Sequence, residues 1–339
     1  MGNRINIGLI GLGYWGSNYL RVLTQLNNVN LYYVCDVDDS KFKKYSNLPS
    51  NVKFSNNPVE LATDKEVKAV IIATPASTHY NIAKVMLETG KHVLVEKPLT
   101  MNYKQALELE NLSNEVNKIL MVGHIYCFNP AVNYIRNILK SGGLGNLYYG
   151  IGLRLGLGPI RRDASCTWDL ATHDMAMLDF LLNKIPVSVS AQASSFLQRE
   201  IKIYDYVTIQ LNYDNFQFSL IESWYTAEKI RSWYIVGSKS MLKFDDMNKD
   251  ASITIYHKYA TVTTNEYKAP DIVVREGDII IPRVSQEEPL LLEVRHFLDS
   301  IKYNRRPIAD GTQGARVVKI LEAVEDSIKK GGMPVSVRD

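Results

Sequence analysis

The sequence predicts an α/β domain built on a parallel sheet, followed by an α+β domain with a mostly antiparallel sheet. Two observations support this prediction. In the first 125 residues, short apolar runs alternate with segments of helical periodicity, which is typical of a parallel sheet with helices on both faces. After about residue 145, stretches that alternate apolar and polar residues take their place and favour antiparallel strands. The length of 339 residues agrees with about two domains.

The composition is that of an ordinary globular protein and excludes several classes. Hydrophobic residues make up 46% and charged residues 22%, so the chain is neither disordered nor fibrous. The net charge is only +3 and basic residues form no stripe, so no nucleic-acid partner is expected. No apolar run is long enough to span a membrane, and the first residues lack the apolar core of a signal peptide. Because Cys35, Cys127 and Cys166 form no C-x-x-C pair, we expect neither disulfides nor a zinc knuckle, and a cytoplasmic location fits best.

The elements of the first domain follow from apolar runs and the residues that end them. Residues 5–10 form a short apolar run that ends in glycines, as a buried parallel strand does. Residues 14–26 carry apolar side chains near helical spacing, and residues 29–35 are rich in β-forming residues and close on Asp36. Further strands are predicted at 67–73, 92–96 and 119–122, and helices at about 78–89 and 103–117. Repeated strand–helix–strand units favour a doubly wound sheet.

The second half is predicted to be an antiparallel meander with few helices. Turns such as Tyr213-Asp214-Asn215 separate its alternating stretches. Predicted strands lie at 187–197, 204–212, 216–224, 231–236 and 253–256, and predicted helices at about 172–182, 288–302 and 314–329. We place the nucleotide-type domain at residues 1–123, the α+β domain at 124–310, and a C-terminal helix that packs back on the first domain at 311–339.

Gly11, Gly13 and Gly16 fit the pattern G-x-G-x-x-G directly after the first predicted strand and at the start of the first helix. The first glycine permits a tight turn, the second lets the backbone approach a pyrophosphate, and the third allows close helix–strand packing. Free N–H groups at the helix start then face the phosphates. Asp36 lies 20 residues after Gly16, where a carboxylate accepts hydrogen bonds from ribose hydroxyls and repels a 2′-phosphate. Because no arginine follows Asp36 immediately, the sequence favours NAD over NADP as cofactor.

Two further motifs close strands at the same edge of the predicted sheet. Thr74 and Pro75 end the third clear strand, where loops at the carboxyl edge meet a cofactor. In Glu96-Lys97-Pro98, the proline keeps Lys97 out of the helical region, so Lys97 is expected to point into the cleft. A lysine near a positively charged nicotinamide ring has its pKa lowered, which suits a proton relay. The alternatives are a plain turn residue at Thr74 and a solvated lysine in a turn at Lys97.

The segment Trp168-Asp169-Leu170-Ala171-Thr172-His173-Asp174 holds a second cluster of reactive side chains. If the segment is helical, Asp169 and His173 share a face, and the carboxylate orients the imidazole and raises its pKa. Such a pair can move a proton near neutral pH. The alternative is a helix-capping Asp169 with a histidine on the helix surface. No metal site is predicted, since neither H-E-x-x-H nor cysteine-ligand spacing occurs.

Taken in order, the glycine turn, the acidic residue, Glu-Lys-Pro and the later Asp-x-x-x-His resemble the Gfo/Idh/MocA oxidoreductases, the glucose–fructose oxidoreductase and inositol dehydrogenase family. The resemblance covers nearly the whole chain. It implies an NAD(P)-binding Rossmann domain and a C-terminal domain with an open, mainly antiparallel sheet, which supplies the substrate site and commonly the oligomer interface. It implies a catalytic set of Lys97, Asp169 and His173, often with a cis bond before Pro98. The implied cofactor-binding set is Gly11, Gly13, Tyr14, Trp15, Gly16, Asp36, Thr74, Pro75, His79, Glu96 and Lys97.

One departure from the family pattern points to a branch within it. Many members have glycine two residues after the aspartate, whereas this chain has Ala171. The form Trp-Asp-Leu-Ala-x-His-Asp is similar to nucleotide-sugar dehydrogenases such as the UDP-N-acetylglucosamine 3-dehydrogenases. The resemblance therefore implies hydride transfer between NAD and the C3 hydroxyl or ketone of a nucleotide-linked sugar. The substrate-binding residues that the resemblance implies are Asn129, Arg154, Arg162 and His173. The two arginines are included because a guanidinium group matches a sugar carboxylate or a diphosphate.

Several alternatives stay open. A free-sugar or inositol dehydrogenase of the same family is the nearest of them. A non-catalytic NAD-binding regulator would keep the glycine turn but need not keep Lys97, Asp169 and His173 together. An NAD-dependent glycosidase or a biliverdin reductase-like enzyme would use the same fold for another reaction. The choice between Lys97 and His173 as proton relay also stays open, as does that between a homodimer and a homotetramer.

Overall fold

The computed structural model of the chain describes residues 4–264 and 270–338, which form two compact units. Unit 1 consists of the described parts of Met1–Phe128 and Glu288–Lys319, and unit 2 of those of Asn129–Glu287 and Ile320–Asp339. The first three residues, part of the segment without a signal-peptide core, lie outside the described residues. Among the described helices, none combines the length and the apolar character that a membrane crossing requires.

Unit 1 contains a six-stranded parallel sheet in the order β3-β2-β1-β4-β5-β6. Its strands are β1 (Ile5–Ile10), β2 (Val29–Cys35), β3 (Lys53–Ser55), β4 (Ala69–Ile72), β5 (His92–Glu96) and β6 (Leu120–Gly123). All four residues of β4 are buried, as expected for a strand that is covered on both faces. The chain order reverses between β1 and β4, and doubly wound sheets bind ligands beyond the carboxyl ends of the strands at this point. The predicted α/β Rossmann domain is confirmed.

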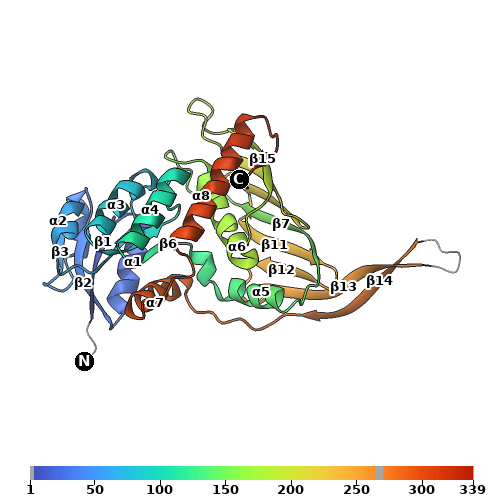
Figure 1. Cartoon of the computed structure of the whole chain (residues 1–339), viewed down its shortest axis with the longest axis horizontal. Helices are drawn as coiled ribbons and strands as arrows, with labels where there is room; N and C mark the ends of the chain where they lie inside the picture. The colour runs from blue at the N-terminus through green and yellow to red at the C-terminus, as the bar shows by residue number, and fades with distance from the viewer. Residues whose placement is uncertain (1–3, 265–269, 339) are drawn as a thin grey trace. The chain divides into compact units, whose positions relative to one another are not determined.

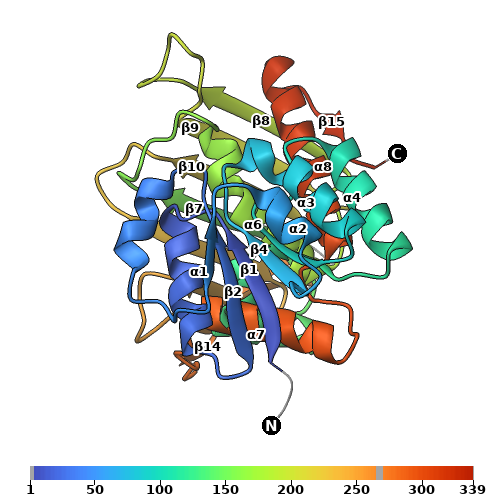
Figure 2. The same cartoon turned by 90° about the vertical axis from the view of Figure 1, so that its left-hand side faces the viewer.

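Helices cover both faces of this sheet (Figure 2). On one face, α1 (Tyr14–Gln25) packs against α7 (Pro289–Lys302). On the other face, α3 (His79–Glu88) lies between α2 (Pro58–Thr63) and α4 (Tyr103–Glu115). α1, α3 and α4 contact strands of the sheet directly, and the glycine turn, Asp36 and Lys97 all stand at the carboxyl ends of the strands.

Residues 288–310, which are predicted above for the second domain, belong to unit 1 in the structure. Glu293 of α7 accepts a hydrogen bond from the Tyr19 hydroxyl at 2.7 Å. The Val122 N–H donates to the Ala309 carbonyl oxygen at 2.8 Å, which adds backbone pairing at the outer side of β6. A helical apolar pattern shows that a helix has a buried face but not which sheet covers that face, so the sequence did not indicate this assignment.

The C-terminal helix α8 (Gly311–Lys329) is divided between the two units at Lys319. In its first part Gly314 lies close to β6, because an added Cβ there would come within 2.7 Å of Val122 Cγ2. In its second part, Ser327 accepts a hydrogen bond from the Ala191 N–H at 2.9 Å. Each half of the helix is therefore packed within the unit to which it belongs.

Unit 2 contains a nine-stranded sheet in the order β14-β13-β12-β11-β7-β10-β9-β8-β15. Its strands are β7 (Leu147–Leu155), β8 (Ser188–Ser194), β9 (Tyr206–Asn212), β10 (Gln217–Ser223), β11 (Ile230–Gly237), β12 (Met241–Asp245), β13 (Ile253–Thr264), β14 (Pro270–Ile280) and β15 (Val335–Ser336). Neighbouring strands run antiparallel except β7 and β10, which pair in parallel. Figure 1 shows β13 and β14 extending together past their neighbours. The predicted α+β domain with a mainly antiparallel sheet is confirmed.

One face of this sheet is packed and the other is open. On the packed face the rings of Phe218 and Trp233 are 4.6 Å apart, and both residues are almost fully buried. On the opposite face Tyr149, Ile151 and Tyr234 are 47%, 39% and 42% exposed, with Tyr234 paired across from Ile151. The helices α5 (Pro130–Lys140) and α6 (Thr172–Leu182) pack against each other in the same unit.

Candidate active site

The glycine turn joins β1 to α1 and is shaped by two close approaches. Gly11 has a φ of +97°, and an added Cβ would lie 2.4 Å from the Ala73 carbonyl oxygen. At Gly16, an added Cβ would lie 1.9 Å from the Gly11 carbonyl oxygen. An added Cβ at Gly13 meets nothing within 4 Å, so this position faces open space. Tight packing at two glycines and an open surface at the middle one are what a pyrophosphate cradle requires, so these residues fit a dinucleotide.

Tyr14 and Trp15 form the first turn of α1 directly after the open glycine. No side chain caps this helix start, so its first N–H groups are left for a ligand or water. The Tyr14 ring is 79% exposed and stands edge-on to the Trp15 ring at 5.6 Å between centroids. Both predicted cofactor-binding residues thus lie at the anion-attracting end of α1.

Asp36 follows β2, and its carboxylate is held by backbone and side-chain donors. The Leu12 N–H donates to Oδ2 at 2.6 Å and the Asp38 N–H donates to Oδ1 at 2.9 Å. Lys41 Nζ lies 3.0 Å from both oxygens. Burial works to raise the pKa of Asp36, but the donors at Asp38, Leu12 and Lys41 outweigh it and hold this pKa below its ordinary value. The carboxylate is therefore ionised at neutral pH and lies beside the glycine turn, where a ribose acceptor is needed.

The loops after β4 and β5 are tied together by His79. Its Nδ1 is 2.8 Å from the Pro98 carbonyl oxygen and its Nε2 is 2.9 Å from the Thr74 carbonyl oxygen. Thr74 also accepts a hydrogen bond from the Thr78 hydroxyl at 2.7 Å. Of the residues predicted to line the cofactor, Pro75 is exposed and Thr74 is half-buried, whereas His79 is 1% exposed. His79 therefore holds the two loops in position through its two ring nitrogens.

Glu96 and Lys97 close β5, with exposed fractions of only 6% and 9%. The Lys97 N–H donates to Glu96 Oε2 at 3.0 Å, and the peptide bond between Lys97 and Pro98 is cis, as the resemblance implied. Tyr19 of α1 donates to Glu293 of α7 and also lies in hydrogen-bonding range of Glu96. Lys97 is therefore backed by a buried cluster of two carboxyl groups and one phenol, rather than being a solvated lysine in a turn.

Burial dominates the ionisation of this cluster. It raises the pKa of Glu96 to about 7, against the opposing influence of the Lys97 charge and the Tyr19 hydrogen bond. It also raises the pKa of Glu293 well above its ordinary value, and the neighbouring Glu96 adds to this effect. Sequence reasoning did not find Tyr19 or Glu293 as site residues, because no local signal links positions 274 residues apart.

Replacing Glu96 by glutamine is expected to reduce the pH dependence of stability. Since the pKa of Glu96 is raised to about 7 in the folded state, that state holds the proton more tightly than the unfolded chain does, and the free energy of unfolding falls as pH rises from about 5 to about 7. Glutamine cannot ionise, so the free energy of unfolding of Glu96→Gln should fall by up to about 2 kcal/mol less than that of the wild type over this range. Urea unfolding at several pH values measures the difference. Glu88→Gln, at an exposed glutamate, is the control, and equal pH slopes for Glu96→Gln and the wild type would contradict the expectation.

His124 follows β6 and has a buried acceptor nitrogen. Its Nδ1 is 2.9 Å from Gln313 Oε1, so Nδ1 carries the proton and Nε2 is the free acceptor. Nε2 meets no hydrogen-bond partner among the described residues. Burial, with a smaller contribution from the charge of Lys97, lowers the pKa of His124 to about 4, so the ring is neutral at physiological pH. A buried acceptor of this kind suits a donor group of a ligand.

Asp169 and His173 lie on consecutive helical turns of unit 2. Residues Thr167–Ala171 form a π-helical turn that runs directly into α6, and such turns are frequent at functional sites. Asp169 does not cap a helix, because its carboxylate accepts hydrogen bonds from Trp224 Nε1 at 3.2 Å and from Arg161 Nη1 at 3.3 Å. His173 is half-buried in the first turn of α6. Lys97 belongs to unit 1 and this pair to unit 2, so their joint action stays a proposal.

Arg154 lies in a buried network with Asp174, the residue that follows His173 in the sequence. Its Nε donates to Asp174 Oδ2, which forms an ion pair with exposed fractions of 6% and 1% for the two side chains. Trp233 Nε1 donates to Asp174 Oδ1 at 2.7 Å. Burial, reinforced by the charge of Asp174, raises the pKa of Glu222 well above its ordinary value. The Arg154 guanidinium thus forms an internal ion pair with Asp174, and this ion pair anchors α6 on β7.

The other two predicted substrate residues differ in exposure. Arg162 is exposed in the loop before the π-helical turn. Asn129 caps α5, since its Oδ1 accepts from the Ala131 N–H at 2.8 Å, and its Nδ2 donates to Asp246 Oδ1 at 3.3 Å. Arg162 is therefore free to approach a ligand from solvent, whereas Asn129 already has a structural role.

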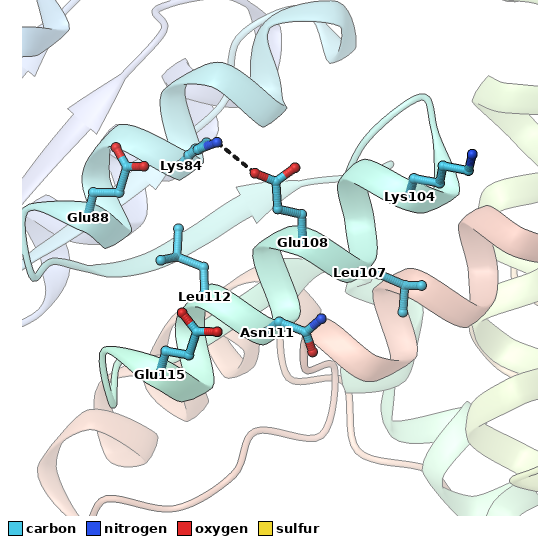
Figure 3. Close-up of a pocket in the computed structure, with 8 residues that line it drawn as sticks. All are labelled: Lys84, Glu88, Lys104, Leu107, Glu108, Asn111, Leu112 and Glu115. Atoms are coloured by element: carbon cyan, nitrogen blue, oxygen red, sulfur yellow. Dashed lines mark hydrogen bonds and ion pairs between the residues drawn. The ribbon is translucent and has the colours of Figure 1, made fainter.

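A surface groove of about 500 Å³ runs between α3 and α4 (Figure 3). Lys84 and Glu108 form an ion pair across it at 2.6 Å. The lining is otherwise exposed and mostly charged: Lys84, Glu88, Lys104, Leu107, Glu108, Asn111, Leu112 and Glu115. None of the site residues predicted from the sequence lines this groove, and we read it as a solvated helix surface. Elsewhere, no group of three or more His, Cys, Asp or Glu side chains within residues 4–264 and 270–338 is placed to hold a metal ion.

Two parts of the chain match an established family. Residues 5–124 match "Oxidoreductase family, NAD-binding Rossmann fold", and residues 166–337 match "Oxidoreductase family, C-terminal alpha/beta domain", both of the Gfo/Idh/MocA group. The matched segments contain the glycine turn, Asp36, Lys97, Asp169 and His173. The first segment contains the strands of the six-stranded parallel sheet, and the second contains most strands of the nine-stranded, mainly antiparallel sheet.

Individual relatives agree with this assignment. The chain is 26% identical over 313 residues to UDP-N-acetylglucosamine 3-dehydrogenase of Acidithiobacillus ferrooxidans, covering 92% of this chain and 93% of that protein. It is 24% identical over 346 residues to scyllo-inositol 2-dehydrogenase (NAD(+)) of Bacillus subtilis, covering 99% and 97%. The solved structure of the Acidithiobacillus ferrooxidans enzyme has the same fold, with a TM-score of 0.81, 24% identity and coverage of 96% of this chain and 98% of that one. An aldose-aldose oxidoreductase of Caulobacter crescentus shares the fold with a TM-score of 0.81 and 16% identity over 98% of this chain and all of that one. The chain is therefore an oxidoreductase of the Gfo/Idh/MocA family.

Proposed function

We propose that this oxidoreductase transfers a hydride between NAD and a secondary hydroxyl or ketone of a sugar, with the C3 position of a nucleotide-linked sugar as the first choice. The observation that supports this most is the placement of a buried lysine, Lys97, at the same strand edge as the glycine turn and Asp36. One unit thus contains both the amine of Lys97 and the glycine turn to which the proposal assigns the dinucleotide. The proposal joins them to the Asp169 and His173 pair of unit 2.

The proposed roles follow from the contacts of each residue. When bound, nicotinamide supplies the hydride acceptor for an alcohol and the hydride donor for a ketone. Lys97 holds the reacting oxygen through Nζ, and His173 accepts the hydroxyl proton during oxidation and returns it during reduction. Asp169, held by Trp224 and Arg161, orients the imidazole of His173. The alcohol thus loses one proton and one hydride and becomes a ketone.

The preference for NAD rests on Asp36. Its ionised carboxylate accepts ribose hydroxyls and repels a 2′-phosphate. Gly11, Gly13, Gly16, Tyr14 and Trp15 hold the pyrophosphate side, and Thr74, Pro75, His79 and Glu96 shape the nicotinamide side. The relative from Bacillus subtilis carries NAD(+) in its name, which agrees with this preference.

Support for a nucleotide-linked sugar comes from the relatives and from one exposed arginine. The Acidithiobacillus ferrooxidans relative acts, by its name, on UDP-N-acetylglucosamine. In the proposal, the exposed Arg162 binds a diphosphate or a sugar carboxylate, and Asn129 and His173 hydrogen-bond the sugar. Arg154 acts on the substrate indirectly, because it fixes α6 through Asp174.

A free inositol or sugar dehydrogenase is the second candidate function. The observation that favours it is the match to a scyllo-inositol 2-dehydrogenase over 99% of this chain. Such an enzyme would use Lys97, Asp169 and His173 in the same way. It would not need Arg162, because its substrate carries no diphosphate or carboxylate. The two candidates therefore differ in substrate and not in chemistry.

A parallel panel of substrates separates these candidates. The protein is incubated with NAD and UDP-N-acetylglucosamine, a UDP-linked uronate, free glucose, myo-inositol or scyllo-inositol, and NADH is followed by its absorbance. NADH formation only with nucleotide sugars, together with a large loss of activity in Arg162→Ala, is the expected result. Activity with inositols or glucose alone would replace the first candidate by the second. Binding of NADH with no turnover in either direction across the panel would favour a non-catalytic regulator.

The proposal also includes assembly and location. The exposed sheet face around Tyr149, Ile151 and Tyr234 supports a homodimer or homotetramer, because a second copy can cover this apolar surface. Cys35, Cys127 and Cys166 are buried free thiols, which supports a cytoplasmic location.

A further inference from the structure

Lys41 lies against the carboxylate of Asp36, the predicted ribose acceptor. Its Nζ is 3.0 Å from both Asp36 Oδ1 and Asp36 Oδ2, so the ammonium group bridges the two oxygens. The Lys41 side chain is 38% exposed and that of Asp36 only 6%. Because the lysine is the exposed member of the pair, it is the charge that a ligand approaching from solvent meets first.

The other donors to Asp36 are fixed backbone groups. The Leu12 N–H occupies Oδ2 and the Asp38 N–H occupies Oδ1. Of these described donors, Lys41 is the one on a flexible side chain and the one that carries charge. A ribose hydroxyl that binds the same two oxygens has to share them with the ammonium group or displace it.

The segment that carries Lys41 is held beside the glycine turn. It is a short 3₁₀ helix, Asp39–Tyr45, and Asp38 caps its start by accepting a hydrogen bond from the Ser40 N–H at 3.2 Å. At its other end the Tyr45 hydroxyl is hydrogen-bonded at 2.7 Å to Ser17 of α1, the residue after Gly16. This link keeps Lys41 at the start of α1, close to the phosphate-facing side of the proposed cofactor site.

We propose that Lys41 is a specificity-determining residue that lets this protein accept NADPH as well as NADH. The proposal rests on the proposed function, in which Asp36 binds the adenosine ribose. A bare carboxylate repels a 2′-phosphate, whereas the Lys41 ammonium group neutralises that carboxylate and can bind the phosphate itself. The protein is therefore expected to prefer NADH over NADPH by less than about tenfold, with Lys41 contributing about tenfold to its NADPH affinity.

The test is direct binding of the two reduced nucleotides, which needs no substrate. Dissociation constants for NADH and NADPH are measured by nucleotide fluorescence or calorimetry for the wild type, Lys41→Ala and Lys43→Ala. Lys43 is an exposed lysine in the same 3₁₀ helix and serves as the matched control. We expect Lys41→Ala to weaken NADPH binding about tenfold with NADH binding changed by less than about twofold, and Lys43→Ala to change neither.

A double-mutant cycle with Asp36→Asn separates the two ways in which Lys41 can act. If Lys41 binds the phosphate directly, Lys41→Ala still weakens NADPH binding in the Asp36→Asn background; if it acts by neutralising Asp36, the effect disappears there. Either result supports the proposal. Equal effects of Lys41→Ala on NADH and NADPH, with both nucleotides bound by the wild type, would overturn it and leave the proposed function intact. Failure of the wild type to bind either nucleotide would overturn the proposed function and this inference together.

Discussion

Replacing Lys97 by alanine is expected to lower kcat about 1,000-fold while NADH binding changes by less than about threefold. In the proposed mechanism Lys97 holds the reacting oxygen through Nζ, and loss of such a group removes transition-state stabilisation rather than ground-state affinity for the cofactor. Steady-state kinetics with the best substrate of the panel, together with NADH titration, measures both quantities.

Because Lys97 is 9% exposed, its loss also removes packing, and a second variant controls for this effect. Lys97→Met keeps the length of the side chain and removes only the ammonium group, so it should lose as much kcat as Lys97→Ala and unfold at nearly the wild-type temperature. Lys104→Ala, at an exposed lysine of α4, should leave both kcat and stability unchanged. Near-normal kcat in Lys97→Met would show that Lys97 is not a catalytic residue.

Gly13→Ala is expected to weaken NADH binding at least about tenfold without a change in thermal stability. An added Cβ at this position meets no protein atom within 4 Å, so the fold has no reason to change. The same methyl group would stand where the backbone has to approach a pyrophosphate closely, and it would keep the phosphates away from the N–H groups of α1. Calorimetric titration with NADH and a thermal melt of the same sample test the two halves of the prediction.

The neighbouring glycines provide the contrast for this experiment. At Gly16 an added Cβ would lie 1.9 Å from the Gly11 carbonyl oxygen, so Gly16→Ala should lower the melting temperature as well as the NADH affinity. Gly158→Ala places a methyl group in open space in unit 2 and should change neither quantity. Wild-type NADH affinity in Gly13→Ala would mean that no pyrophosphate lies against this turn.

The Rossmann part of the fold could be predicted because its strands are continuous apolar runs. The four buried residues of β4 and the glycines that follow β1 carry this information locally. Shorter elements gave weaker signals: β3 is only three residues long, and its Phe54 is 39% exposed. α5 is absent from the elements predicted above, although Asn129 and Pro130 are an N-cap and first-turn pair that indicates its start.

The site could be predicted where its residues follow strands, and not where it depends on contacts across the chain. The glycine turn, Asp36 and Lys97 stand at strand ends, and strand ends of a parallel sheet share an edge. The bond between Tyr19 and Glu293 and the ion pair between Arg154 and Asp174 depend on packing that no spacing rule contains. Arg154 illustrates the consequence, since its residue type suggested a substrate anion and the fold provides a buried carboxylate instead.

Hydride transfer between a sugar carbon and the nicotinamide ring can be followed with a deuterated substrate. UDP-N-acetylglucosamine carrying deuterium at C3 is incubated with NAD and the protein, in parallel with myo-inositol deuterated at its carbinol carbons, and the reduced cofactor is examined by mass spectrometry. We expect one deuterium to appear on the nicotinamide ring with one of these substrates, and we expect Lys97→Met to abolish the transfer. Oxidation of either substrate with no deuterium in the cofactor would contradict the proposed mechanism, as would wild-type transfer by Lys97→Met.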